Sequence, residues 1–283
     1  MTTPWLSFAL PLTFTLSLPG PAPEVTPLGR RVGLGIEGAT LFVPDGYRPA
    51  VGEVVDVVLH LHGSPSVVEP ALVNARWRAV LIAFNRKGLS RVYAEPFSDR
   101  MLFPRLLDAA RASLKDLGLA EDLPFGRIVV SSFSVGFGGV RELLKVPEHL
   151  HRTDGLVMAD SIYCGYTGDP AKPQVDPALM DGFRRFAIEA AAGRKTFLLT
   201  HSAQVPGGYA STTETADFLI HAVGGSPEVA KVVWEPGWTQ TRACSRGRFV
   251  VLGCSGAAGA DHMNHLRQIG KVWERYLAIP AVR

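Results

Sequence analysis

The stretch RIVVSSFSVGFGGVRELL, residues 127–144, contains three serines between a β-branched run and a segment with helical spacing. A serine attacks a carbonyl carbon when a neighbouring base takes its proton, and a tight strand-to-helix turn exposes such a serine. The residues two before and two after it must be small, because the backbone passes close to itself there. Ser131 and Ser132 each have a Phe or Val at one of these positions. Ser134, flanked there by Ser132 and Gly136, is therefore the candidate nucleophile.

Two other interpretations compete with this one. Ser255, in LGCSGAAGADH, also has small residues two before and two after it, but the segment AAGA separates it from any helix, so we interpret it as a loop residue. Alternatively, Ser134 is an ordinary serine of a glycine-rich turn, such as a phosphate-binding loop. That alternative is weaker, because no Lys followed by Ser or Thr comes after the glycines.

The segments around these serines alternate between two patterns. Five β-branched runs end in small or polar residues and predict buried parallel strands within residues 51–63, 78–85, 126–132, 154–161 and 195–202. Apolar residues at helical spacing lie between or after them, at about 102–114, 140–144, 177–191, 213–223 and 262–277. A last strand is expected within 246–256, and residues 30–46 predict an antiparallel pair that turns near Glu37 and Gly38. The expected fold class is α/β, with a mainly parallel central sheet flanked by helices and antiparallel N-terminal strands.

In such folds, ligands bind at the carboxyl ends of the strands. There, SFSVG followed by helical spacing resembles the nucleophile elbow of the α/β-hydrolases, with Ser132 in place of the usual glycine. The resemblance covers the chain from about Val32 to the C-terminus and implies a serine hydrolase that uses no cofactor. The segment from Asp160 to Lys195 has room for a loop and one helix, so no large lid domain is expected.

The α/β-hydrolases carry nucleophile, acid and histidine in that order along the chain. Asp160, at the end of DGLVMADS, is the expected acid, as in some lipases of this fold; the alternative is that it only serves a turn. Glu214 and Asp217 are reserve acids, because STTE at residues 211–214 is better explained as a capping box.

The histidine is expected in ADHMNHLRQIGKVWERYL, after the last strand. His262 follows Asp261, a candidate N-cap, and lies where a loop meets a helix, so it is the expected base. His265 lies one turn further on, aligned with residues of the expected packed face, and is the reserve base. The oxyanion hole is expected at the backbone N–H of Gly63 or Ser64, together with that of Val135.

A metal-dependent hydrolase is the sharpest alternative chemistry. His60 and His62 are two apart on a strand, and His262 and His265 are one turn apart, so the four can be metal ligands. We expect no metal, because no carboxylate or cysteine lies near His62 in the sequence.

The composition and the N-terminal segment indicate which cellular locations and binding partners to expect. The chain of 283 residues is 47% hydrophobic and 19% charged, with a net charge of +3 and no long basic run, so no nucleic-acid partner is expected. Residues 1–27 contain an apolar block followed by prolines, which predicts a signal-like or disordered leader before a single domain at 28–283. Cleavage of the leader implies a secreted or periplasmic protein without stable membrane insertion. An uncleaved leader implies a cytoplasmic one.

Three cysteines and several aromatic residues are the remaining candidates, the cysteines for a disulfide and the aromatic residues for a substrate-binding wall. Cys244 and Cys254 can pair in an oxidising compartment, which leaves Cys164 single. An apolar substrate wall is expected from the aromatics near strand ends, namely Phe133, Phe137, Tyr163, Tyr166 and Tyr209. The predicted activity is hydrolysis of small-molecule or polymeric carboxylic esters, with an amidase or peptidase next. A hydrolase-fold protein that binds a ligand without turnover is the alternative outside enzymes.

Overall fold

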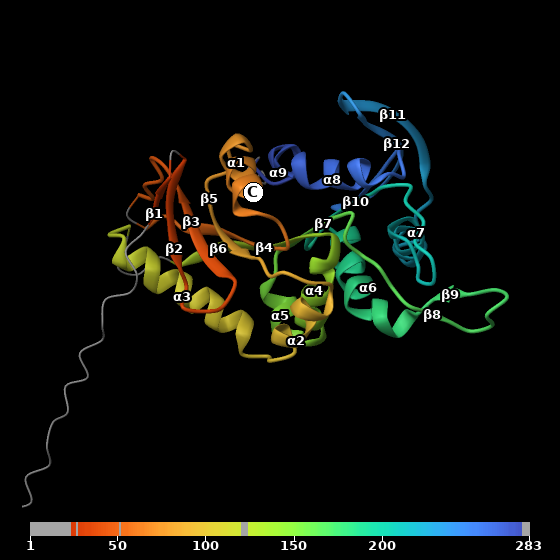
Figure 1. Ribbon diagram of the computed structural model, residues 1–283, viewed down its shortest axis with the longest axis horizontal. Helices are drawn as coiled ribbons and strands as arrows, with labels where there is room; N and C mark the ends of the chain where they lie inside the picture. Colours follow the sequence, from red (N-terminus) through yellow and green to blue (C-terminus); the bar gives the residue numbers. More distant parts are fainter. Residues whose placement is uncertain (1–23, 27, 51, 120–123, 279–283) are drawn as a thin grey trace, which may run out of the picture.

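The computed structural model describes residues 24–26, 28–50, 52–119 and 124–278 (Figure 1). Over these residues the chain builds one eleven-stranded sheet with helices on both faces. In spatial order the strands are β1 (Glu24–Thr26), β2 (Gly29–Gly33), β3 (Ala39–Pro44), β5 (Ala79–Phe84), β4 (Val55–Leu61), β6 (Phe125–Phe133), β7 (Gly155–Ala159), β10 (Thr196–His201), β13 (Phe249–Cys254), β12 (Trp238–Arg246) and β11 (Glu228–Glu235). The expected α/β architecture is confirmed.

The six central strands, from β5 to β13, run parallel to one another. Their apolar residues are buried because helices cover both faces, which explains the nearly continuous β-branched runs. In register, His60 of β4 pairs with Ser131 of β6, and Phe133 of β6 pairs with Ala159 of β7. The polar residues that follow these strands therefore meet at one edge of the sheet.

Antiparallel strands extend the sheet at both ends. The pair β2 and β3 turns where the sequence predicted, and β3 joins the parallel block through β5. At the opposite end, the hairpin of β11 and β12 continues from β13 and curves away from the body of the molecule in Figure 1. The sequence analysis did not anticipate this hairpin. Most of β11 is exposed, so it lacks the apolar pattern of a buried strand.

The helices form two layers (Figure 1). One layer packs residues such as Leu106, Leu143 and Phe183 onto one face of the sheet and consists of α2 (Arg91–Phe97), α3 (Leu102–Asp116), α4 (Phe137–Lys145), α5 (Pro147–Arg152), α6 (Pro177–Ala191) and α7 (Thr212–Ala222). The other packs Leu72, Leu266 and Trp273 onto the second face and consists of α1 (Pro65–Asn74), α8 (Gly259–Arg267) and α9 (Ile269–Tyr276). The single helix expected at 262–277 is thus two helices, which meet at Gln268.

The segment between β7 and α6 is short. It contains a two-stranded ribbon of β8 (Tyr166–Thr167) and β9 (Gln174–Val175), and then α6 leads directly to β10. Within residues 160–195 the described chain therefore carries no lid domain, as expected. The N-cap Asp176 accepts a hydrogen bond from the backbone N–H of Ala178 and fixes the start of α6.

Cys244 and Cys254, which could pair in an oxidising compartment, are not paired in this structure. In the β12–β13 ladder Cys244 lies opposite Val251, and Cys254 lies opposite Gln240, so the two are offset along the strands. Both thiols are free and buried, as is that of Cys164. Burial raises the pKa of the Cys254 thiol to about 12, which keeps it protonated and unreactive.

The leader expected at residues 1–27 lies mostly outside the described residues. Of its residues, 24–26 are described, and they pair with Gly29, Arg30 and Arg31 as the edge strand β1. Among the residues that the structure describes, no helix combines the length and apolarity needed to cross a membrane.

Candidate active site

Ser134 occupies a strained turn between β6 and α4. A 3-10 turn, Ser134–Gly136, joins the two elements, and Ser134 has φ of 49°, in the left-handed region that non-glycine residues rarely adopt. A Cβ on Gly136 would lie 2.4 Å from the carbonyl oxygen of Leu61, which is why this position must be glycine. Strain of this kind persists only where the surroundings hold it, and here it exposes the hydroxyl at the end of the strand.

Ser132 replaces the glycine usual in the elbow pattern, and the structure shows how it is accommodated. Its side chain is fully buried, and its Oγ lies 2.5 Å from Oγ of Ser161. The Ser161 hydroxyl donates to the carbonyl oxygen of Ser134 at 2.8 Å. Because the Ser161 hydrogen is used in that bond, the Ser132 hydroxyl is the donor between the two serines. The serine therefore contributes to a hydrogen-bond chain beneath the turn.

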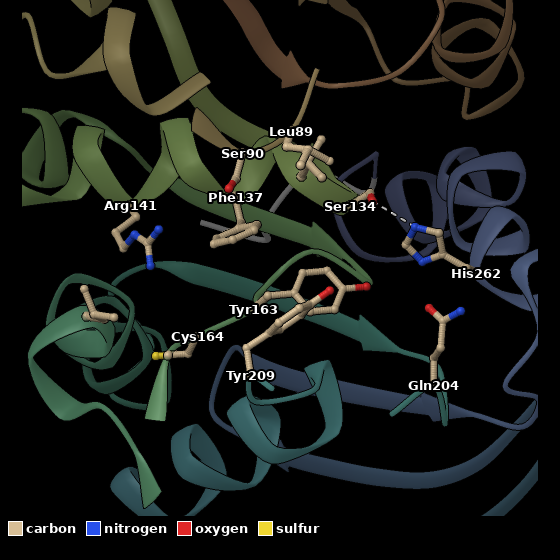
Figure 2. Close-up of a pocket in the computed structure, with 13 residues that line it drawn as sticks. Leu89, Ser90, Ser134, Phe137, Arg141, Tyr163, Cys164, Gln204, Tyr209 and His262 are labelled. Carbon is tan, nitrogen blue, oxygen red and sulfur yellow. Dashed lines mark hydrogen bonds between the residues drawn. The ribbon is translucent and has the colours of Figure 1, made fainter. Parts of the chain in front are cut away.

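His262 connects the serine to a carboxylate. Its Nε2 lies 2.9 Å from Oγ of Ser134, and its Nδ1 lies 2.7 Å from Oδ2 of Asp160 (Figure 2 shows the first contact). Since the carboxylate can only accept, Nδ1 carries the hydrogen, and Nε2 has the lone pair that accepts from the serine hydroxyl. The three expected residues, far apart in the sequence, are brought together in one chain of hydrogen bonds.

The local setting of His262 differs from the expectation. The helix α8 begins at Gly259 with Ala258 before it, so Asp261 lies in the first turn rather than at the N-cap. The Asp261 carboxylate still accepts from the backbone N–H of Ala258 at 2.9 Å. The ring of His262 stacks against Phe133, with centroids 4.6 Å apart, and this contact sets its orientation.

Asp160 is fully buried at the end of β7, with φ of 45°. Besides His262, it accepts hydrogen bonds from the backbone N–H of Ser202 at 3.0 Å and from the hydroxyl of Thr212. Burial raises the pKa of this carboxyl. The hydrogen bonds from His262, Thr212 and Ser202 lower it more, so the pKa lies well below the usual range and Asp160 is ionised.

The reserve acids are engaged elsewhere. Glu214 accepts from the backbone N–H of Ser211 at 2.8 Å, completing the predicted capping box, and also from the hydroxyl of Tyr166. Asp217 forms an ion pair with Arg242. Neither is hydrogen-bonded to His262.

The reserve base His265 and the rival nucleophile Ser255 are also not part of the hydrogen-bond chain from Ser134 through His262 to Asp160. His265 is buried, its Nδ1 is 2.7 Å from the hydroxyl of Thr200, and burial lowers its pKa to about 4. Ser255 is exposed and donates to the carbonyl oxygen of Thr239 at 3.3 Å.

The four histidines of the metal alternative have separate partners. His60 is buried with Nδ1 3.0 Å from the hydroxyl of Ser131, and burial lowers its pKa to about 3. His62 has φ of 65°, which breaks the strand alternation, and its Nδ1 lies 2.8 Å from the Tyr93 hydroxyl. Over the described part of the chain, no group of three or more His, Cys, Asp or Glu side chains is arranged to hold a metal ion.

The expected oxyanion residues lie in two places. Val135 lines the pocket directly after Ser134. The backbone N–H of Gly63 donates to Oδ1 of Asn85 at 3.2 Å and is therefore already used. Ser64 precedes α1, and its hydroxyl pairs with that of Ser66. Gly63 and Ser64 are not among the described residues that line the pocket.

A pocket of about 520 Å³ opens beside the serine (Figure 2). Ser134 and His262 lie at one end in this view, Arg141 and Cys164 at the other, and Phe137 and Tyr163 between them. Tyr163 and Tyr209 are wall residues, as expected. Phe133 is not, because it is buried between the rings of His62 and His262. Tyr166 does not line the pocket either.

Sequence analysis missed several pocket residues, notably Leu89, Arg141 and Gln204. Arg141 carried a usable signal, since it lies one helical turn after Phe137 and thus on the same face of α4. Leu89 and Gln204 lie in loops, where spacing gives no indication of direction.

No protein-family model matches this chain, and no curated protein is detectably similar to it in sequence. Among solved structures it is similar to an esterase from Thermogutta terrifontis, at 14% identity and a TM-score of 0.48 over 91% of this chain and 97% of that one. It is also similar to an esterase from Pyrobaculum calidifontis, at 13% identity and a TM-score of 0.44 over 85% of this chain and 81% of that one. A siderophore hydrolase from Aspergillus nidulans is similar at 10% identity and a TM-score of 0.46, over 96% of this chain and 99% of that one. By its own strand order and flanking helices, the chain has an α/β-hydrolase-like fold, with the Ser134, His262 and Asp160 chain at the carboxyl edge of the parallel strands.

Proposed function

We propose that this protein hydrolyses carboxylic esters through an acyl-enzyme on Ser134. The observation that carries the proposal is the continuous hydrogen-bond chain from the Ser134 hydroxyl through His262 to the buried, ionised Asp160. A hydroxyl that donates to a neutral imidazole is prepared to lose its proton, and a carboxylate on the far side stabilises the imidazolium that results.

The reaction has two halves. Oγ of Ser134 bonds to the acyl carbon while Nε2 of His262 takes the serine proton. The tetrahedral intermediate collapses when His262 returns that proton to the leaving alcohol oxygen, which breaks the ester bond. Water then attacks the acyl-enzyme, again giving its proton to His262, and Ser134 leaves with that proton. The net products are a carboxylic acid and an alcohol.

The negative oxygen of the intermediate needs hydrogen-bond donors. We assign the backbone N–H of Val135, which lies at the start of the helical segment and gains from its dipole. The sequence-based candidates for the second donor are Gly63 and Ser64; the N–H of Gly63 is already bonded to Asn85, and neither residue lines the pocket. The absence of a lid domain in the described residues suits small or extended esters.

The experiment is active-site labelling with a fluorophosphonate, which reacts much faster with activated serines than with ordinary side chains. Wild type is expected to be labelled and to hydrolyse p-nitrophenyl butyrate. Ser134→Ala is expected to lose both, while His262→Ala is labelled far more slowly. Ser255→Ala is the matched control and is expected to behave as wild type. A folded wild-type sample that neither reacts nor hydrolyses esters contradicts the proposal; p-nitroanilide substrates separate an esterase from an amidase.

A further inference from the structure

Arg141 lies at the end of the pocket opposite Ser134 (Figure 2). It is on α4, the helix that starts directly after the serine turn, and it lies about 6 Å further along the helix axis than Phe137. Its guanidinium carbon lies 5.1 Å from the centre of the Phe137 ring, so the aromatic ring holds the cation against the pocket wall. The side chain is half-buried.

The guanidinium of Arg141 has no carboxylate partner among the described residues. Several half-buried arginines of this chain are paired with a carboxylate, among them Arg31 with Glu69, Arg127 with Asp56, and Arg242 with Asp217. Arg30 instead donates to the carbonyl oxygen of Leu117. A partly buried cation loses hydration, and such groups are normally compensated by an opposite charge. Among the described residues, the direct partner of the Arg141 guanidinium is the face of the Phe137 ring.

The pocket as a whole favours an anion. Of the described residues that line it, Arg141 and His262 are the two that can be positively charged, and none is Asp or Glu. Glu142 on the same helix is bound by Lys145, and Asp181 on the facing α6 is bound by Arg184. Asp176, the N-cap of α6, lies near Cys164, and its carboxylate accepts from the backbone N–H of Ala178. A guanidinium offers two parallel N–H groups that match a carboxylate.

The proposed chemistry sets which part of the substrate reaches Arg141. His262 must protonate the leaving alcohol, so the alcohol lies on the histidine side of Ser134. The acyl chain then extends away from His262, between Phe137 and Tyr163, toward the other end of the pocket (Figure 2). A carboxylate at the far end of the acyl chain would meet Arg141.

Resting on the proposed function, we propose that the preferred substrates are esters whose acyl group carries a second, free carboxylate, and that Arg141 binds that carboxylate. The reaction is then the hydrolysis of a half-ester: water is added, the ester bond breaks, and a dicarboxylic acid and an alcohol are released. Arg141 acts as a specificity-determining residue and takes no part in proton transfer.

The test compares two substrates of equal acyl length, ethyl hydrogen glutarate and diethyl glutarate, whose distal carboxyl is masked. Half-esters of succinic and adipic acid vary the length. In Arg141→Gln, kcat/KM for the best half-ester is expected to fall by about tenfold to a hundredfold, the usual range for a charged hydrogen bond, while the diester changes less than about twofold. Arg141→Lys is expected to recover part of the lost kcat/KM, because lysine keeps the positive charge but lacks the two parallel N–H groups of a guanidinium.

Lys145→Gln is the matched control. It removes the same charge from the same helix, but the Lys145 ammonium binds Glu142 and does not line the pocket. An unchanged half-ester to diester ratio in Arg141→Gln, or an equal change in Lys145→Gln, overturns the inference while ester hydrolysis itself stands. If no ester is hydrolysed, the proposed function fails separately. Calorimetry with glutarate then decides the Arg141 site, which is overturned by the absence of binding to wild type or by equal binding to Arg141→Gln.

Discussion

Oγ of Ser132 and Oγ of Ser161 lie 2.5 Å apart, both buried beneath the turn that carries Ser134. Ser161→Ala removes the donor to the Ser134 carbonyl and leaves the Ser132 hydroxyl without its acceptor, so we expect a loss of about 1–3 kcal/mol in the free energy of unfolding. Ser132→Ala removes one neutral bond and orphans no donor, and about 1 kcal/mol is expected. Urea unfolding measures both.

Ser161→Ala also tests whether Ser161 positions the Ser134 hydroxyl for reaction. Ser161→Ala is expected to lower kcat for p-nitrophenyl butyrate and slow fluorophosphonate labelling, with KM nearly unchanged, because the turn that aims Ser134 loses its support. A purely structural role would lower stability and leave the labelling rate of the folded protein as in wild type.

Asp160→Asn is expected to reduce kcat on the order of 10³–10⁴-fold, because an amide no longer stabilises the imidazolium of His262 or holds its Nδ1–H tautomer. Glu214→Gln is the control among the reserve acids. It weakens the capping box of α7, which is expected to cost about 1 kcal/mol of stability and little activity. Steady-state kinetics on both variants separates them; equal activity losses would be inconsistent with Asp160 as the acid.

Gly136→Ala places a Cβ 2.4 Å from the carbonyl oxygen of Leu61, so the backbone must move. We expect a loss of about 1–3 kcal/mol in stability together with slow fluorophosphonate labelling. Gly259→Ala, at the start of α8, meets nothing within 4 Å and is expected to be neutral or slightly stabilising. Thermal unfolding compares the two, and a Gly136→Ala protein as stable and reactive as wild type would remove the steric requirement.

Acid is expected to destabilise the protein in two stages. Burial lowers the pKa of His265 to about 4 and that of His60 to about 3, so between about pH 6.5 and pH 4 the unfolded chain binds protons that the folded protein excludes. Each such histidine lowers stability by about 1.4 kcal/mol per pH unit as pH falls through that window. Below about pH 4 Asp160 adds to the loss, because its pKa is lowered on folding and only the unfolded chain is protonated there.

Urea unfolding between pH 8 and pH 4 measures this slope. His265→Gln is expected to reduce the slope by about 1.4 kcal/mol per pH unit, the contribution of one proton. Stability that stays constant from pH 7 to pH 5 would show that these histidines are not held neutral by folding.

Local patterns in the sequence were enough to predict features that depend on near neighbours. The small residues around Ser134 follow from a turn within a few residues, and the start of α7 follows from the Ser211 to Glu214 capping box. The parallel strands were predictable because burial on both faces demands apolar runs. The β11–β12 hairpin was not, because exposed edge strands carry no such requirement.

Only the tertiary structure decided which distant side chains meet. The sequence favoured Asp160 over Glu214 and His262 over His265, but it could not show which of these side chains meet. Strand register and the position of α8 bring Asp160 and His262 to 2.7 Å. The same holds for Phe133, which supports His262 rather than lining the pocket, and for Arg141, whose lack of a carboxylate among the described residues depends on every neighbouring element. Hydrogen bonds act over about 3 Å, whereas sequence periodicity specifies only a face of a helix or strand. The contacts across those faces are set by packing.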